Sequence, residues 1–325
     1  MAVVNWNTAE LALAAAHAFR TSTGVRAQVI VFDNLSRPEE RRFLREGADG
    51  VRAVLAGRNH GYGGAANIAL KGDGELVCVS NGDLLPQADA LSRLAEAALG
   101  DPAAGMVGPV FDGGTQHYHA RLPGPGTLLA RTLLGSFGRR VPAAPRAGER
   151  ATVGQVSGAC FVMRRALWEE VGGFDDGFFL WYDDVDLARR LVDRGRRNLV
   201  VGSARVRHAG AGSFAQIDSP TAQAIRLDSL ERYLGKHHPG WTPMARPLLW
   251  LARALRARRP GSGRGEALGG AARRDEGHPP VPGQVLEVGD DEVPGVEGGA
   301  AAGHEGEHRG RLEQKLERES RREVA

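Results

Sequence analysis

Residues 155–195, QVSGACFVMRRALWEEVGGFDDGFFLWYDDVDLARRLVDRG, are the stretch that decides the fold. An apolar run typical of a buried strand (155–164) leads directly into a helical pattern (165–172). A second helix is predicted over 184–194, where Gly195 supplies the stop signal. Because strands that alternate with helices pack as layers around a sheet, this stretch predicts an α/β domain.

The same alternation extends toward the N-terminus. Four apolar runs are each followed by a helical pattern, which predicts βαβ units around a mostly parallel sheet. The expected strands are 2–6, 27–33, 51–56, 76–83 and 105–111, and the expected helices are 8–20, 37–46, 64–71 and 87–99. The chain begins almost inside the first of these strands, which leaves its true start open.

The rest of the chain divides by composition. Residues 123–150 are rich in Pro and Gly and are expected to be irregular, whereas helices are expected over 221–236 and 244–258. In the tail, 260–325, Gly, Glu, Arg and Pro dominate. Such a tail cannot bury enough apolar surface to offset the entropy of ordering, so we expect it to be disordered.

Charge and cysteine content limit the class of protein. Residues 1–259 carry 33 Lys and Arg against 25 Asp and Glu, whereas 260–325 carries 9 against 14. The basic body favours anionic partners, but no nucleic-acid-binding motif is present, so no nucleic-acid partner is expected. The sequence has no signal peptide and no apolar run near the roughly 18 residues of a membrane span. Cys78 and Cys160 lie in strand-like runs and are expected to be reduced, which fits a cytoplasmic protein.

Polar side chains stand where three predicted strands end. Asn5 and Asn7 follow the first strand, Asp33 ends the second, and Asn81 and Asp83 end the fourth. An Asp in such a position is commonly a turn former or a helix cap. Ligands of open α/β sheets bind beyond the carboxyl ends of the strands, however, so convergence of these side chains predicts a site there.

A glycine-rich loop, RNHGYGGAAN at 58–67, opens the third predicted helix. Gly61, Gly63 and Ala66 have the spacing of a dinucleotide-binding fingerprint, and Asp83 follows about twenty residues on, which makes an NAD-dependent oxidoreductase an alternative. That fingerprint normally follows the first strand of its unit, whereas this one follows the third. We expect instead that the glycines let backbone approach a nucleotide beside a helix N-terminus, with a plain tight turn as the structural alternative.

Ligands suited to a divalent cation are present at two places. Asn81 and Asp83 offer oxygen atoms of the kind that Mg²⁺ and Mn²⁺ prefer, and either ion can bridge a diphosphate. His208 ends a later strand-like run, and its imidazole would favour Mn²⁺, although a lone His is more often structural.

Three carboxylates, Asp183, Asp184 and Asp186, follow directly behind five bulky side chains. Acidic residues in a first helical turn complement the helix dipole and cap free N–H groups, which alone would account for them. At helical spacing Asp184 points away from the other two. Beside Trp181 and Tyr182 a partly dry carboxylate has a raised pKa and is suited to accept a proton, while the rings offer a platform for a sugar.

In order and spacing, these segments resemble the inverting nucleotide-sugar glycosyltransferases of family 2, which have the GT-A fold, and in particular bacterial rhamnosyltransferase-like members. The resemblance covers roughly residues 1–240. It is carried by AVVNWNT, VIVFDN, NHGYGGAANIAL, SNGD, the long stretch at 157–191 and ARVRHAGAGS. It implies a GT-A type Rossmann-like nucleotide-binding sheet, with a nucleotide-sugar-binding half at 1–110 and a contiguous acceptor-binding, catalytic half at 111–240.

The resemblance also implies roles for single residues. Asp184 matches the second acid of the family's Glu-Asp pair and is expected to be the catalytic base, with Asp183 in the place of the usual Glu. Asp83 matches the last acid of the metal-binding DXD-type motif, and His208 the position that completes the metal and diphosphate site. The acceptor-binding residues are expected to be Trp181, Tyr182 and Asp183, and the nucleotide-binding residues Asn5, Asn7, Asp33, Asn59, Gly61, Gly63, Gly64, Asn67 and Asn81.

The implied reaction is metal-dependent, inverting transfer of a sugar, with rhamnose favoured, in cell-envelope polysaccharide synthesis. The donor would be dTDP-rhamnose or a UDP-sugar, and the acceptor a hydroxyl of a glycan or of a polyprenyl-diphosphate-linked sugar. A non-catalytic nucleotide-sugar-binding protein is a further alternative, which leaves Asp184 without a purpose. Residues 241–259 predict a basic amphipathic helix, which lies either against the core or on the anionic inner face of the plasma membrane as a peripheral contact.

Overall fold

The computed structural model describes residues 1–47, 50–112, 118–119, 121–134, 143–208 and 219–257. The strands are β1 (Ala2–Asn5), β2 (Ile30–Asp33), β3 (Arg52–Leu55), β4 (Leu76–Asn81), β5 (Leu84–Pro86), β6 (Ala104–Asp112), β7 (Tyr118–His119), β8 (Arg150–Val153), β9 (Gln155–Val156), β10 (Cys160–Arg164) and β11 (Arg197–His208). The helices are α1 (Ala9–Arg20), α2 (Pro38–Gly47), α3 (Gly61–Ala69), α4 (Ala90–Gly100), α5 (Pro125–Leu134), α6 (Arg165–Val171), α7 (Asp183–Asp193), α8 (Ser219–His237) and α9 (Thr242–Ala257).

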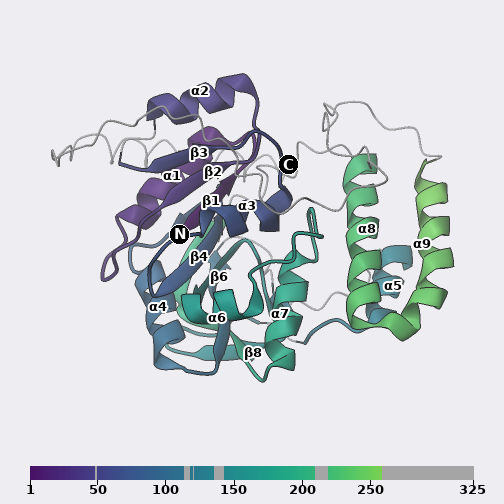
Figure 1. Ribbon diagram of the computed structural model, residues 1–325. Helices are drawn as coiled ribbons and strands as arrows, with labels where there is room; N and C mark the ends of the chain where they lie inside the picture. The colour runs from purple at the N-terminus through teal and green to yellow at the C-terminus, as the bar shows by residue number, and fades with distance from the viewer. Residues whose placement is uncertain (48–49, 113–117, 120, 135–142, 209–218, 258–325) are drawn as a thin grey trace, which may run out of the picture.

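One long sheet forms the centre of the molecule (Figure 1), in the order β3-β2-β1-β4-β10-β6-β11-β5, with β8 paired to β11. The strands β3, β2, β1 and β4 are parallel, as the alternation of strands and helices predicts. The predicted strand over 155–164 divides into β9 and β10, and β10 enters the sheet antiparallel to both β4 and β6. The sheet is therefore parallel in its N-terminal half and mixed beyond β4.

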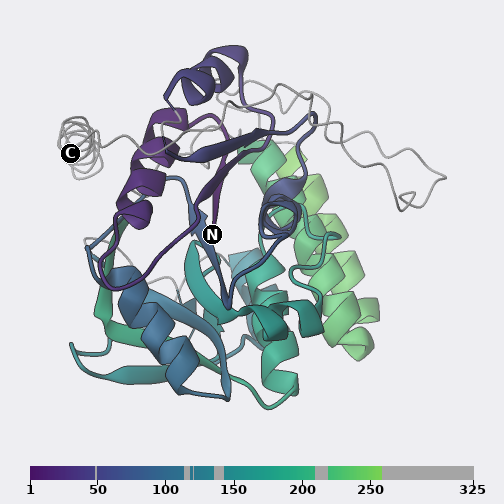
Figure 2. The same cartoon turned by 60° about the vertical axis from the view of Figure 1, so that its left-hand side comes forward.

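Apolar side chains cover both faces of this sheet. On one face α1 and α4 pack through alanines, leucines and Phe19 against Val3, Val31 and neighbouring strand residues. On the other face α3, α6 and α7 pack against Val77, Val79 and their neighbours. Figure 2 shows the two helical layers on either side of the strands. The predicted α/β class is thus confirmed.

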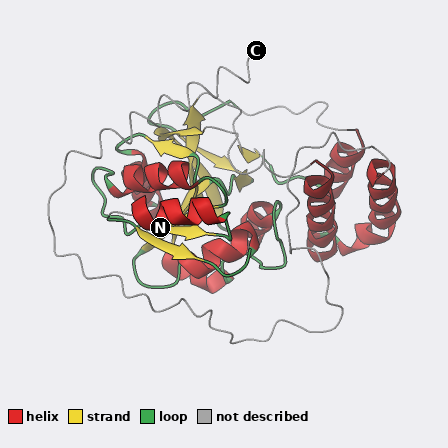
Figure 3. Ribbon diagram, turned by 90° about the horizontal axis from the view of Figure 1, so that it is seen from above, coloured by secondary structure: helices red, strands yellow, loops and turns green. Residues whose placement is uncertain are grey.

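A third apolar cluster joins α5, α8 and α9 into one helical unit, which stands beside the sheet in Figure 3. The expectation that 123–150 is irregular is wrong for Pro125–Leu134, because Leu128 and Leu129 of α5 are buried against this unit. The prediction of a disordered tail over 260–325 lies outside the described residues. Within the part that the structure describes, no helix has the length and apolar character needed to cross a bilayer.

The segment from Gly173 to Tyr182 is held between α3 and α8. On the α3 side, Tyr62 N donates to the carbonyl of Phe179 at 2.9 Å, and Asn67 Nδ2 donates to the carbonyl of Phe174 at 2.9 Å. On the α8 side, Ser229 Oγ donates to the carbonyl of Leu180 at 2.8 Å. These contacts fix the backbone that leads into α7, which begins at Asp183.

The docking of α3 on this segment predicts a specific cost for Gly61→Ala. Gly61 has φ +73°, and an added Cβ would overlap the carbonyl of Phe179. Gly195 is a matched control, because it also has φ +73° but has nothing within 4 Å of an added Cβ. We expect Gly195→Ala to lower the free energy of unfolding by roughly 1–3 kcal/mol, and Gly61→Ala to lower it by about 2 kcal/mol more. Urea unfolding measures both, and equal losses would contradict the contact.

Candidate functional site

The polar side chains at the ends of β1 and β2 form a buried network. Asn5 Nδ2 donates to Asp33 Oδ1 at 2.9 Å, and both residues have no exposed surface. The other oxygen of Asp33 accepts from Ser36 N at 3.2 Å. Asn7 joins the same network through its own N–H, which donates to Ser36 Oγ at 2.7 Å. The ends of β1 and β2 therefore lie together, as expected. Their polar side chains are already hydrogen-bonded to one another and form a frame.

The glycines predicted to form a loop lie in the first turn of α3 (Gly61–Ala69), and a pair of asparagines fixes the chain that leads into them. Asn34, which with Asp33 forms the polar end of the second strand but had no predicted role, donates through Nδ2 to Asn59 Oδ1 at 2.8 Å and to the carbonyl of Gly61 at 3.0 Å. Its Oδ1 accepts from His60 N at 2.7 Å. Its position directly after Asp33 at a strand end was the sequence feature that could have indicated a role. Its partner, 25 residues away, could not be deduced from that position.

The glycines themselves have protein neighbours. An added Cβ on Gly63 would come within 2.8 Å of Phe174 Cβ, and one on Gly64 would lie 3.3 Å from His60 Cβ. Asn67, expected at the nucleotide, instead binds the backbone of Phe174 through both its donor and its acceptor, and donates to Asp176 Oδ1 at 2.7 Å. Close packing of α3 on the 173–182 segment therefore accounts for these small and amide residues.

A second group of residues lies where β4 ends. Asn81 N donates to the carbonyl of Ala159 at 2.8 Å, and the N–H of the preceding residue, Gly158, donates to Asp184 Oδ2 at 2.9 Å. The β4 end is thus linked to the N-terminus of α7. Burial raises the pKa of Tyr62 well above its ordinary value, and the charges of Asp183, Asp184 and Asp83 add to this effect. The charges of all three carboxylates therefore act on one half-buried tyrosine.

His208 is brought to the same place through the backbone. The last residues of β11 pair antiparallel with β5, and His208 lies opposite Leu84, the residue that follows Asp83. The side chain of His208 lies outside the described residues, and Asp83 is partly exposed. No group of three or more His, Cys, Asp or Glu side chains is arranged to hold a metal among the described residues. A carboxylate beside an imidazole-bearing strand end nevertheless fits Mn²⁺ or Mg²⁺ if phosphate oxygens complete the shell.

Asp184 is held by three donors. Gln155 Nε2 and Gly158 N donate to Oδ2 at 2.7 and 2.9 Å, and Val185 N donates to Oδ1 at 2.8 Å. Burial raises the pKa of Asp184 in spite of these hydrogen bonds, which oppose the shift. Gln155 was not predicted to belong to the site, because the sequence does not indicate which distant side chain a polar residue in an apolar run will contact.

Asp183 has a different environment. Its side chain is only 5% exposed, Oδ1 accepts from Asp184 N at 3.0 Å, and Oδ2 has no hydrogen-bond partner within the described residues. Burial and the neighbouring charge of Asp184 raise the pKa of Asp183 to about 8. Since Asp183 and Asp184 both accept from first-turn N–H groups, the capping role that the sequence allows is also present.

Asp186 is paired with cations. It accepts from Arg190 Nε at 2.8 Å, and its other oxygen lies 2.7 Å from both Lys236 Nζ and His237 Nε2 of α8. Burial alone would raise the pKa of Asp186, but the bonds from His237 and Lys236 outweigh it and lower that pKa. Three neighbouring aspartates thus have three different surroundings, and only Asp186 binds α7 to α8.

The two aromatic residues before α7 adopt an uncommon backbone. Trp181 and Tyr182 have φ +63° and +64°, a left-handed conformation that costs roughly 1–3 kcal/mol for each bulky residue. The ring of Tyr182 packs on that of Tyr233 of α8, with centroids 5.8 Å apart. Both aromatic side chains are half-buried, so they border the site at which α7 begins.

Comparison with known proteins relates this chain to sugar-transferring enzymes. A family model described as glycosyltransferase like family 2 matches residues 2–223. The N-acetylglucosaminyl-diphospho-decaprenol L-rhamnosyltransferase of Mycobacterium tuberculosis (strain ATCC 25618 / H37Rv) is 30% identical over 253 residues, 71% of this chain and 81% of that relative. A low-salt glycan biosynthesis hexosyltransferase of Haloferax volcanii is 24% identical over 186 residues, 55% of this chain and 57% of that relative.

Two solved structures share the fold. GalNAc-T7 with UDP, GalNAc and Mn²⁺ has a TM-score of 0.53 and 16% identity, and the match covers 72% of this chain but only 47% of that longer one. The mannosyltransferase of Pyrobaculum calidifontis in complex with GDP-Man and Mn²⁺ has a TM-score of 0.50 and 20% identity, over 79% of this chain and 72% of that one.

The buried carboxyl of Asp183 predicts a pH dependence of stability. Its pKa rises from an ordinary 3.8 to about 8 on folding, so the folded state binds more protons than the unfolded state between these values. The free energy of unfolding therefore falls as pH rises from about 4 to 8, by on the order of a few kcal/mol, and levels off above.

Asp183→Asn removes this titration. The free energy of unfolding of the variant should therefore increase relative to that of the parent as pH rises toward 8. Asp193→Asn, at the exposed end of α7, should keep the parent's pH dependence. Unfolding free energies measured from pH 5 to pH 9 test both variants. Parallel curves for the parent and Asp183→Asn would show that Asp183 is ionised throughout.

Proposed function

Since the chain belongs to glycosyltransferase family 2, we propose that it transfers a sugar, with rhamnose favoured, from a nucleoside-diphosphate donor to a hydroxyl of a glycan or polyprenyl-linked acceptor, with inversion at the anomeric carbon. Such a reaction belongs to cell-envelope polysaccharide synthesis. The observation that carries the proposal is the arrangement of Asp184, which is held at the N-terminus of α7 and linked by hydrogen bonds to the end of β4.

Asp184 has the properties of a general base. Its Oδ2 is fixed by Gln155 and Gly158, and burial raises its pKa, which makes the carboxylate a stronger proton acceptor. Asp183 beside it stays protonated up to about pH 8, so the pair carries a single negative charge at neutral pH. That charge resides on Asp184, because Asp184 has the hydrogen-bond donors and Asp183 Oδ2 has none within the described residues.

The chemistry follows from this assignment. Asp184 removes the proton of the acceptor hydroxyl while that oxygen attacks the anomeric carbon of the donor sugar. The bond from that carbon to the diphosphate breaks on the opposite face, so one displacement inverts the configuration. Trp181 and Tyr182 border the acceptor, and the strand-end frame of Asn5, Asp33 and Asn59 lies on the nucleotide side.

Asp83 and His208 are the residues that would hold a divalent cation, with Asn81 beside them. A bound Mn²⁺ or Mg²⁺ would neutralise charge on the departing nucleoside diphosphate. Two structures with the same fold contain Mn²⁺, which supports a divalent ion without choosing between the two metals.

The donor and acceptor are proposed from the relatives. The mycobacterial relative is named for L-rhamnosyl transfer to N-acetylglucosaminyl-diphospho-decaprenol, which supports dTDP-rhamnose as donor and a polyprenyl-diphosphate-linked sugar as acceptor. A UDP-sugar remains the competing donor. Incubation of the purified protein with each activated sugar, with and without acceptor, and measurement of released nucleoside diphosphate tests the choice.

The two other functions that the sequence allowed have less support. The fingerprint glycines of an NAD-dependent oxidoreductase follow β3, the edge strand, rather than the first strand of the sheet, and Gly61 and Gly63 pack on Phe179 and Phe174. A non-catalytic nucleotide-sugar-binding protein does not need a base held by three donors. Turnover of a bound donor separates it from the enzyme.

Asp184→Asn should lower kcat by about 10²–10⁴-fold and change the donor KM by less than about threefold, because it removes the proton acceptor but not the donor site. Asp193→Asn is the matched control on the same helix and should turn over like the parent. Steady-state kinetics with the preferred donor measure both. Turnover of Asp184→Asn within about threefold of the parent would remove Asp184 from this role.

Asp83→Ala should abolish the dependence of activity on Mn²⁺ and weaken nucleotide binding by about tenfold or more, because a carboxylate ligand is lost. Asp89→Ala, which removes an exposed carboxylate at the start of α4, is the control. Calorimetric titration of nucleoside diphosphate with and without Mn²⁺ gives both affinities. An unchanged affinity in Mn²⁺ would place the metal site elsewhere.

A further inference from the structure

The outer side of α9 exposes a continuous apolar face. Among the described residues eight large apolar side chains are exposed, and four of them lie between 241 and 251. Met244, Trp250 and Leu251 are 57%, 68% and 44% exposed, and the exposed Pro247 lies one helical turn from each of them. We call these four residues the α9 face.

The opposite side of α9 is already occupied. Ala245, Leu249 and Ala252 are buried in the apolar cluster that α9 shares with α5 and α8. This cluster also contains Phe178 and Val185, which lie on either side of Trp181 and Tyr182 in the chain. One side of α9 therefore packs against the core, as the core-facing alternative predicted. The α9 face lies on the other side of the helix and is not covered by this packing. The cluster also connects α9 to the segment proposed to border the acceptor.

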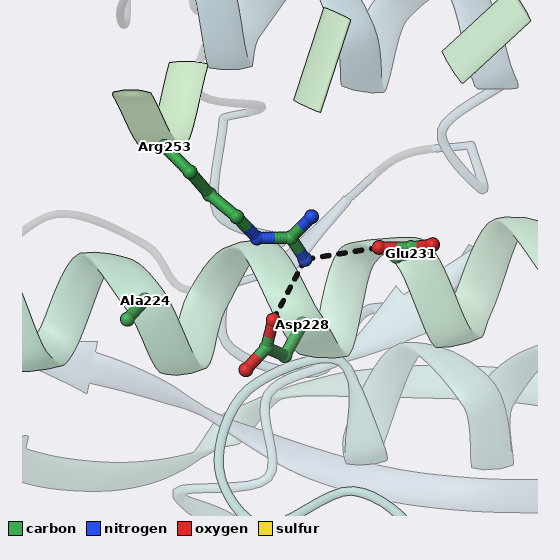
Figure 4. Close-up of a pocket in the computed structure, with 4 residues that line it drawn as sticks. All are labelled: Ala224, Asp228, Glu231 and Arg253. Carbon is green, nitrogen blue, oxygen red and sulfur yellow. Dashed lines mark hydrogen bonds and ion pairs between the residues drawn. The ribbon is translucent and has the colours of Figure 1, made fainter. Parts of the chain in front are cut away.

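Ion pairs hold α9 on α8. Arg253 Nη2 donates to Asp228 Oδ1 at 2.7 Å and to Glu231 Oε2 at 2.9 Å, in a hollow of about 540 Å³ that Ala224 also lines (Figure 4). Arg246 Nε lies 3.2 Å from Glu231 Oε1, and its side chain is 69% exposed. These two acids are the only ones in the sequence between 226 and 259, which carries eight Lys and Arg. Arg232 and Lys236 pair with Asp175 instead. Over residues 226–257, six Lys and Arg stand against the two acids, so this part of the sequence carries a net positive charge.

We propose that the α9 face inserts into the headgroup boundary of an anionic lipid bilayer and so brings the acceptor side of the active site to a lipid-linked acceptor. An amphipathic helix with Trp and Leu on one side and cations beside them binds such a boundary through buried apolar area and attraction to anionic lipids. The choice of a bilayer rests on this excess of cations together with the proposed function, in which the acceptor is polyprenyl-linked.

The test is sedimentation of the full-length protein with vesicles of phosphatidylglycerol and phosphatidylcholine in equal parts, and with vesicles of phosphatidylcholine alone. The parent should bind the anionic vesicles more strongly. The triple variant Met244→Ser/Trp250→Ser/Leu251→Ser should bind them at least about tenfold more weakly, because it loses the apolar area that inserts. The matched control, Phe43→Ser/Leu99→Ser/Val192→Ser, removes exposed apolar side chains of other helices and should bind within about twofold of the parent.

Several outcomes would overturn this proposal. Equal vesicle binding by the parent and the α9 triple variant would do so, as would a parent that binds no vesicles. If the triple variant instead converts a dimer to a monomer in sedimentation without affecting vesicle binding, a second copy covers the face. Unchanged nucleotide affinity of the triple variant is the check that it folds.

Activity separates this proposal from the proposed function. The triple variant should turn over a water-soluble acceptor like the parent but lose turnover of an acceptor carried in vesicles. If it uses the vesicle-borne acceptor as well as the parent does, the docking proposal fails and the sugar-transfer proposal stands. If the parent binds vesicles through α9 but transfers no sugar to either acceptor, the sugar-transfer proposal fails and the docking proposal stands.

Discussion

The fixed backbone of the segment from Gly173 to Tyr182 is the constraint on which the site depends. Its carbonyls accept hydrogen bonds from Tyr62 and Asn67 of α3 and from Ser229 of α8, so it is tied on two sides before α7 begins. Two consecutive bulky residues with positive φ persist only where such contacts over-determine them. The direction of α7, and with it the position of Asp184, follows from that turn.

The same constraint explains why three like charges can stand together at the start of one helix. Asp186 is neutralised from α8, and Asp183 holds its proton because burial raises its pKa to about 8. One carboxylate, Asp184, therefore carries the charge, and three donors hold it in one orientation. Different surroundings rather than different residue types give the three aspartates different roles.

Local patterns in the sequence predicted the local features of the fold. The alternation of apolar runs and helical patterns predicted the parallel strands β1 to β4, and the spacing in α7 predicted that Asp184 points away from Asp183 and Asp186. Features set by distant partners could not be predicted: the antiparallel entry of β10, the burial of α5, and the bond from Gln155 to Asp184. The glycine loop shows the difference clearly, because its spacing matches a nucleotide fingerprint while its Cβ-free positions are required by Phe174 and Phe179.

The candidate site itself has two parts, one held by contacts between neighbouring strand ends and one held by contacts from the distant helix α8. The side proposed to bind the nucleotide consists of strand ends whose polar network forms within residues 5–61, and all of it lies inside the family model. The side proposed to bind the acceptor packs on α8 and α9, and the family model ends at residue 223, near the beginning of α8. The contacts that hold Leu180, Tyr182 and Asp186 come from Ser229, Tyr233 and Lys236, all beyond that point. If the proposed roles hold, a change of acceptor can arise in the helical unit without disturbing the frame proposed to hold the donor.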